Sequence, residues 1–161
     1  IPCVNAARRS QIEALLPKFA DLSVNLVDND TRSALVAANA AMIKSGTSTL
    51  EAMLLGRPMV VSYKLGSFSY RIASRLVDTP YIALPNILAG EELVPELIQD
   101  AATPEALARA LLPLLDEDHE SARRAGVFAE MHRQLRDGAS GHGANATAAL
   151  EISRLLFAHK R

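Results

Sequence analysis

The sequence contains a single cysteine, Cys3, among 161 residues. One cysteine excludes an internal disulfide framework and is typical of a reducing compartment. Long apolar runs are missing as well: none approaches the roughly 20 residues that a transmembrane helix needs, and no segment resembles a signal peptide. An excess of charge is also missing, because the net charge at pH 7 is only -1, so the composition does not favour a nucleic-acid partner.

Several common motifs of catalysis and ligand binding are missing too. The four histidines do not have the spacing of a metal site, and we interpret them as surface residues: His119, His132, His142 and His159. There is no Walker A sequence and no G-x-S-x-G, and the G-x-G at 141–143 does not follow a predicted strand. We therefore expect neither a metal site nor a bound cofactor.

The elements that are present alternate between strand and helix at short intervals. Strands are predicted over residues 23–27, 40–44, 59–61 and 81–84. Helices are predicted after the caps Asn5, Asp30 or Thr31, Ser48, Ser67 and Thr103, the first of them carrying Ile12, Leu15, Leu16 and Phe19. Gly56 and Pro58 are predicted to end the Ser48 helix, and further helices are predicted near 91–99 and over 107–115. This alternation predicts an α/β fold: a Rossmann-like parallel sheet with helices on both faces.

After residue 116 the predicted strands stop. Helices are expected over 119–136 and 146–159, joined by a Gly-rich connector at 138–143. We therefore divide the chain into a domain over 1–116 and a helical extension over 117–161. The extension has apolar faces that need a partner, either a missing domain or a second subunit, through Phe128, Met131, Leu155 and Leu156. Because the chain starts at Ile1, without a methionine, we expect an N-terminal part to be missing.

The segment at 43–63 is the most informative part of the chain. The turn Ser45, Gly46 and Thr47 ends a strand and opens a helix, which aims free N–H groups and the positive end of the helix dipole at a phosphate-sized site. The pair Ser48 and Glu51 has the spacing of a capping box. Glu51 is also placed to accept hydrogen bonds from ribose hydroxyls. An ordinary turn with a reciprocal cap is the alternative interpretation of this segment.

Two further groups of residues are candidates for ligand contact. Asn86 lies in the loop predicted over 85–90, directly after a strand. Its amide is suited to hydrogen-bond a phosphate or a sugar hydroxyl. The alternative is that it stabilises its own turn. Lys64, Arg71 and Arg75 form a basic set, with the two arginines on one helix face at i, i+4 spacing. These cations are candidates for a leaving diphosphate or for anionic lipid headgroups, or they form a solvated face.

The runs SGTSTLEAMLLGRPMVVSYKLGSFSY, LPNILAG and ELVPEL together resemble lipid-A-disaccharide synthase. The resemblance extends over most of the chain and is strongest over 45–115. The turn with its glutamate is shared by many glycosyltransferases that have two Rossmann-like domains, whereas the LPNILAG loop is far more specific. The chain is thereby identified with the C-terminal, nucleotide-binding half of a GT-B glycosyltransferase.

The resemblance implies a reaction and a site. The family transfers 2,3-diacylglucosamine from UDP to 2,3-diacylglucosamine 1-phosphate with inversion, giving the β(1→6) disaccharide of lipid A and UDP, without a divalent metal. The UDP-sugar site implied in this half comprises Ser45, Gly46, Thr47, Ser48, Glu51, Asn86, Arg71 and Arg75. The resemblance places most of the acceptor site and the catalytic base in the N-terminal half, so no catalytic residue is assigned here and we expect the isolated chain to be inactive.

The resemblance also implies a setting, namely lipopolysaccharide synthesis in Gram-negative bacteria. We expect a cytoplasmic protein, peripheral at the cytoplasmic face of the inner membrane, and a possible homodimer. Two rival functions stay open. One is the donor domain of another UDP-GlcNAc-dependent glycosyltransferase or epimerase, and the other is a non-catalytic α/β interaction module.

Overall fold

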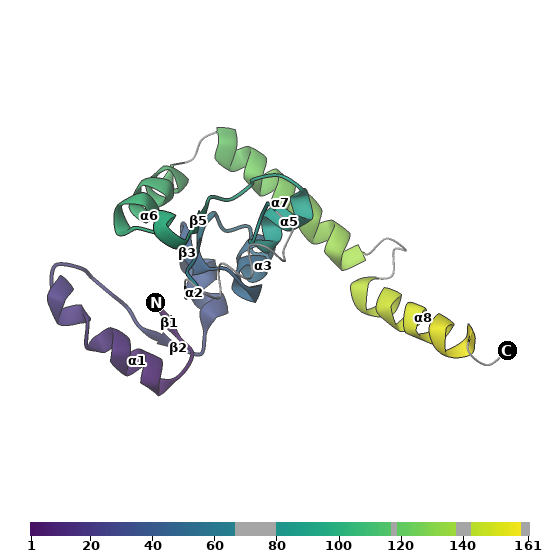
Figure 1. Cartoon of the computed structure of the whole chain (residues 1–161), viewed down its shortest axis with the longest axis horizontal. Coiled ribbons are helices and arrows are strands. Elements are labelled where there is room, and N and C mark those ends of the chain that lie inside the picture. Colours follow the sequence, from purple (N-terminus) through teal and green to yellow (C-terminus); the bar gives the residue numbers. More distant parts are fainter. Residues whose placement is uncertain (67–79, 117–118, 138–142, 159–161) are drawn as a thin grey trace.

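The computed structural model describes residues 1–66, 80–116, 119–137 and 143–158. In chain order its strands, helices and 3-10 helices are β1 (Pro2–Cys3), α1 (Ala6–Glu13), η1 (Leu16–Phe19), β2 (Val27–Asp28), α2 (Thr31–Ala37), β3 (Ala41–Lys44), α3 (Thr47–Leu54), β4 (Met59–Tyr63), α5 (Leu84–Ala89), β5 (Glu96–Ile98), η2 (Gln99–Ala101), α6 (Pro104–Leu111), η3 (Leu112–Leu115), α7 (His119–Asp137) and α8 (Gly143–Ala158). Figure 1 shows α8 projecting away from the other elements.

The strand pairs of the described residues are all parallel. β1 pairs with β2, and a separate sheet has the strand order β3-β4-β5. In the larger sheet Lys44 lies opposite Ser62, and Tyr63 lies opposite Ile98. Parallel neighbours need a crossover connection, which α3 provides between β3 and β4. The predicted α/β fold with a parallel sheet is confirmed.

Helices cover both faces of the three-stranded sheet (Figure 1). On one face Met59 and Val61 of β4 join a core with Met53 of α3 and Phe128 of α7. Val60 points to the opposite face because side chains alternate along a strand. It is fully buried there, where α6 contacts β3 and β4. Fully burying each such side chain stabilises the fold by about 1.5–3 kcal/mol.

Four of the helix caps predicted from the sequence are present in the structure. The side chains of Asn5, Asp30 and Thr103 accept the backbone N–H three residues further on, at 2.9, 3.0 and 3.2 Å. Each satisfies a donor that the first turn of a helix leaves free. Gly56, with a φ of 67°, ends α3 in the left-handed conformation that glycine adopts without strain.

Two predictions near the N-terminus are partly wrong. The first α-helix ends at Glu13, and Leu16 and Phe19 lie in η1, because Pro17 has no N–H with which to continue α1. The strand predicted over 23–27 is β2, which contains only Val27 of that range. Its pairing is limited to the two residues of β1.

The region between residues 81 and 115 differs more from the prediction. The strand over 81–84 and the loop over 85–90 are wrong: residues 81–83 form no strand, and 84–89 form α5, with Pro85 in its first turn and Gly90 at its end. The helix near 91–99 is also wrong, because Glu96–Ile98 is β5, held by pairing with β4. The helix over 107–115 ends at Leu111 and continues as η3. The helix predicted from Ser67 lies outside the described residues.

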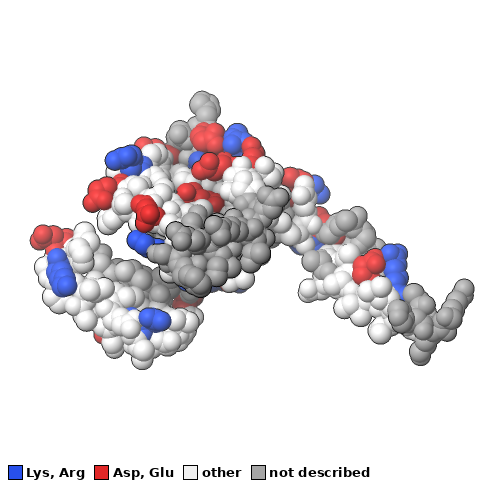
Figure 2. Space-filling view, in the orientation of Figure 1, with Lys and Arg blue, Asp and Glu red and all other residues white. Residues whose placement is uncertain are grey.

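The two predicted C-terminal helices are present as α7 and α8, and α8 begins earlier than expected, at Gly143. Phe128 and Met131 do not need an outside partner, because they are buried in the core against α3. Leu155 and Leu156 of α8 are 69% and 65% exposed. The arm formed by α8 also carries few charged side chains in the view of Figure 2. The domain boundary at 116 stays a prediction.

Within the described ranges, no helix is both long enough and apolar enough to cross a membrane.

Candidate functional site

The turn between β3 and α3 has a backbone that only glycine adopts readily. Gly46 has φ 153° and ψ -167°, a region that is essentially restricted to glycine, and it stands at the N-cap position of α3. Apart from Gly46 itself and its two chain neighbours, no atom of the described residues lies within 4 Å of the place where a Cβ would stand. In the part of the chain that the structure describes, no side chain makes a capping hydrogen bond at this end of α3. The turn therefore presents the first N–H groups of α3 and the positive end of the helix dipole.

The predicted capping box between Ser48 and Glu51 is wrong. α3 begins at Thr47, so Ser48 is already the second helical residue and does not occupy the N-cap. Thr49 instead donates its hydroxyl hydrogen bond to the carbonyl of Gly46, at 2.7 Å. Among the described residues, the carboxylate of Glu51 has no hydrogen-bond or ion-pair partner. The reciprocal cap no longer competes with a ligand for this carboxylate.

Ser45 connects the turn to the segment before α5. Its hydroxyl donates to the carbonyl of Ile82 at 2.8 Å, across 37 residues of sequence. Its backbone N–H donates to Ser62 of β4. The hydroxyl proton of Ser45 is thus committed within the protein, which leaves its oxygen lone pairs for a ligand.

Asn86 is fully buried, and its amide makes four hydrogen bonds inside the protein. The oxygen accepts the N–H groups of Leu93 and Val94, and the nitrogen donates to the Val94 carbonyl and to Glu96, all at 2.8–2.9 Å. Both donor hydrogens and both acceptor lone pairs of the amide are used. Asn86 therefore ties α5 to the segment before β5, and its amide has no hydrogen-bonding capacity left for a ligand.

Glu96 is the second member of this cluster. Its carboxylate accepts the backbone N–H groups of Ile82 and Ala83 at 2.9 Å, in addition to the amide of Asn86. A carboxylate from β5 thus holds the N-terminal end of α5. Because Ile82 also accepts from Ser45, one network of hydrogen bonds links β3, β5 and α5.

A cavity of about 650 Å³ lies along α3. Its lining comes from the β2–α2 turn, α3 and α7: Asn29, Asp30, Thr31, Arg32, Ser48, Glu51, Leu54, Leu55 and His132. The size lies within the usual range of small-molecule sites, and both helix starts follow carboxyl ends of parallel strands, where ligands of α/β proteins bind. The structure thus brings Ser48 and Glu51 together with residues that were not predicted as site residues.

The β2–α2 turn was predicted as a helix cap but not as part of the site, because its strand was predicted too early. Asn29 has a φ of 52°, and Asp30 follows it at the cap of α2. Hydrogen bonds from the side chain and backbone N–H of Ser33 hold the pKa of Asp30 below its ordinary value. The cavity therefore carries a charged carboxylate at neutral pH. An Asn-Asp-Thr sequence after a strand was the signal available.

The predicted cations are placed only in part. Lys64 is exposed directly after β4, and Arg71 and Arg75 lie outside the described residues. Lys44, which was not predicted as a site residue, is the last residue of β3, and its ammonium lies 5.6 Å from the centre of the Tyr63 ring. His132 is exposed, as predicted. The described ranges contain no cluster of His, Cys, Asp or Glu that fits a metal ion.

Residues 1–150 match the family of lipid-A-disaccharide synthetases. This chain belongs to that family. A lipid-A-disaccharide synthase of Pseudomonas aeruginosa (strain LESB58) is 51% identical over 150 residues, which cover 93% of this chain and 39% of the relative. The lipid-A-disaccharide synthase of Sodalis glossinidius (strain morsitans) is 49% identical over 151 residues, covering 93% of this chain and 40% of the relative.

The match to the lipid-A-disaccharide synthetase family includes every element of the candidate site. The β3–α3 turn, α5, β5 and His132 all lie within residues 1–150, and only α8 extends past the matched span. The chain spans about two fifths of the length of these curated relatives.

Proposed function

We propose that this chain supplies the donor site of a glycosyltransferase that makes the lipid A disaccharide. The ligand in this proposal is UDP-2,3-diacylglucosamine. The observation that carries the proposal is a juxtaposition: the Gly46 turn opens α3, and the cavity beside α3 is lined by Ser48 and by the carboxylate of Glu51, which has no partner among the described residues. Membership of the lipid-A-disaccharide synthetase family supports this choice of substrate.

In the proposed reaction the 6-hydroxyl oxygen of 2,3-diacylglucosamine 1-phosphate attacks the anomeric carbon of the donor. The bond from that carbon to the diphosphate oxygen breaks, and its electron pair leaves with UDP. The proton of the attacking hydroxyl passes to a base, which we place outside this chain. A single displacement of this kind inverts the anomeric centre.

The contribution of this chain is therefore positional and electrostatic. The N–H groups at the start of α3, from Gly46 to Ser48, face the diphosphate, where the helix dipole favours negative charge by about 0.3–1 kcal/mol. Glu51 accepts hydrogen bonds from the ribose hydroxyls. Ser45 and Asn86 hold the turn and α5 in place. Because cations and N–H groups neutralise the leaving group, the proposal includes no metal ion or cofactor.

Arg71 and Arg75 remain in the proposed site on the strength of the sequence alone. They follow β4, whose carboxyl end lies next to that of β3. Either guanidinium is suited to a phosphate oxygen because its donors match the geometry of two acceptors. The same two arginines are candidates for contact with anionic lipid headgroups.

The remaining proposals concern the setting of the enzyme. We propose a cytoplasmic protein that is peripheral at the cytoplasmic face of the inner membrane, because both substrates carry acyl chains. We also propose that a second copy covers α8 in a homodimer. The side chains that support this are apolar and exposed: Leu150, Ile152, Leu155, Leu156 and Phe157. Such a face is costly in water.

Calorimetric titration with UDP tests the donor site. Glu51→Gln is expected to weaken UDP binding by about 10- to 100-fold. The reason is that the ribose hydroxyls would then donate to a neutral amide oxygen and no longer to a charged carboxylate. Its melting temperature should stay that of the parent, because this carboxylate has no partner in the described part of the fold. Glu151→Gln, on the distant helix α8, is the matched control and should leave UDP affinity unchanged.

Each rival function has a distinct outcome. No UDP binding by the complete protein that carries this chain would favour a non-catalytic module. UDP binding together with consumption of unacylated UDP-GlcNAc, and not of the acylated donor, would favour another transferase or an epimerase. Turnover of UDP-2,3-diacylglucosamine with release of UDP supports the proposal.

A further inference from the structure

Lys44 occupies an unusual place for an exposed lysine. It is the last residue of β3 and directly precedes Ser45 and Gly46 of the turn. Its ammonium lies 5.6 Å from the centre of the Tyr63 ring, which belongs to the neighbouring strand β4. A cation within about 6 Å of an aromatic face is attracted by about 0.5–1 kcal/mol at an exposed site. The ring therefore restrains a charge that would otherwise be mobile.

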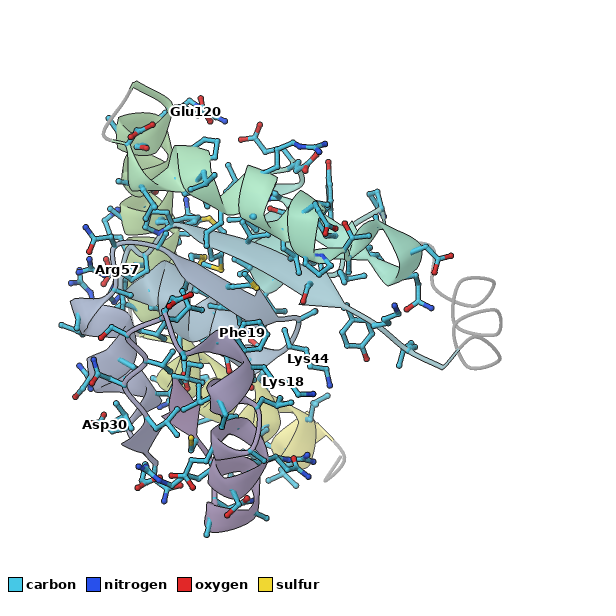
Figure 3. All side chains as sticks on the ribbon, turned by 90° about the vertical axis from the view of Figure 1, so that its left-hand side faces the viewer. Lys18, Phe19, Asp30, Lys44, Arg57 and Glu120 are labelled. Carbon is cyan, nitrogen blue, oxygen red and sulfur yellow. The ribbon has the colours of Figure 1, made fainter. Side chains whose placement is uncertain are left out.

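This ammonium has no carboxylate partner within the described ranges. The ion pairs found there involve other cations, on α1, α7 and α8: Arg9, Arg123, Arg133, Arg136 and Arg154. The acidic residue of β5, Glu96, which lies two strands away on the far side of β4, accepts two backbone N–H groups and the Asn86 amide instead. Lys44, labelled in Figure 3, thus brings to the carboxyl edge of the sheet a positive charge that no carboxylate of the described residues neutralises.

We propose that Lys44, oriented by Tyr63, binds the diphosphate of the nucleotide sugar. This inference rests on the proposed donor site and names its cation. The ammonium and the N–H groups of the Gly46 turn are adjacent in sequence and lie at the same edge of the sheet. In this proposal the N–H groups and the ammonium both bind the diphosphate. Lys44 also neutralises the negative charge that develops on UDP as the anomeric bond breaks.

The competing interpretation is a surface lysine that merely rests against a ring. The two interpretations predict different effects of a neutral residue at position 44 on the affinities for UDP and for uridine. A residue that binds the diphosphate affects UDP and not uridine, because uridine has no phosphate. A residue that only supports the local fold affects both ligands or neither.

The experiment is a titration of the complete protein that carries this chain with UDP and with uridine. Lys44→Met is expected to weaken UDP binding by about 5- to 20-fold and to leave uridine binding within about twofold. Lys44→Arg keeps the charge and should stay within about threefold for UDP. UDP affinity of the Lys44→Met variant should also depend less on ionic strength, because one screened interaction is gone.

Two further variants test the aromatic contact. Tyr63→Leu removes the ring and should weaken UDP binding by about two- to fivefold, whereas Tyr63→Phe keeps the ring and should not. Lys18→Met removes another exposed lysine, on η1, and is the matched control for a loss of charge (Figure 3). It should leave both affinities unchanged.

The outcomes are separable. Unchanged UDP affinity in a folded Lys44→Met variant overturns the inference, and so does an equal loss of UDP and uridine affinity. A parent protein that does not bind UDP overturns the proposed donor site itself. Selective loss of UDP affinity, rescued by arginine, supports both.

Discussion

Replacing Asn86 by alanine should damage the fold far more than the size of the side chain indicates. The amide of Asn86 satisfies the buried N–H groups of Leu93 and Val94 at 2.8 and 2.9 Å. It also donates to the Val94 carbonyl and to Glu96. Leaving a buried donor without a partner costs about 1–3 kcal/mol. Two orphaned N–H groups alone therefore cost about 2–6 kcal/mol, and we expect a loss of about 4 kcal/mol, a large fraction of the 5–15 kcal/mol typical of a domain.

Urea denaturation followed by circular dichroism measures this loss. Asn86→Ala should lower the denaturation midpoint without changing the slope, because the surface exposed on unfolding is nearly the same. Leu88→Ala is the control: Leu88 lies on the same helix and is 50% exposed, so its truncation should cost less than about 1.5 kcal/mol.

The opposite pattern would refute this reasoning. If Asn86→Ala were as stable as Leu88→Ala and yet lost affinity for UDP, the amide would be a ligand contact and not a structural clamp. The buried geometry around Asn86 would then have to open when the nucleotide binds.

Two further predictions concern local features near the cavity. Gly46→Ala should destabilise the protein by about 1–3 kcal/mol, measured by denaturation, because the cost is backbone strain alone. Gly66→Ala, which has open space and no positive φ, is the control and should cost nothing measurable. Because the pKa of Asp30 is lowered by its hydrogen bonds with Ser33, its contribution to stability is fully present above the ordinary value of 3.8 and is lost as pH falls through the folded pKa. The advantage of the parent over Asp30→Asn should therefore shrink between pH 7 and pH 3, and an advantage that is constant with pH would contradict this assignment.

The sequence predicted the parts of the fold that depend on neighbours along the chain. The caps at Asn5, Asp30 and Thr103 and the glycine that ends α3 act over three to six residues, so their chemistry is visible locally. The strands β3 and β4 were also predicted, because their apolar residues are continuous and bounded by turn residues. The resemblance to the lipid-A-disaccharide synthetases rested on the run from the Ser45 turn through β4 and on the segments 84–90 and 92–97.

The errors of prediction share a different cause. The segment from residue 81 to residue 99 carries a strand pattern where α5 forms and a helix pattern where β5 forms. Its state is decided by Glu96, which holds the start of α5, and by the pairing of β5 with β4. Such contacts join residues more than ten positions apart, and no local pattern records them.

The sequence by itself determined the order of the elements around the turn, the identity of the turn residues and the family. Only the tertiary structure decided what those residues do. It showed that Glu51 is free of a cap, that the amide of Asn86 is fully used, and that Lys44 lies against Tyr63. The physical reason is that a hydrogen-bonding group has a limited capacity, and only the folded chain shows which partners have already taken it.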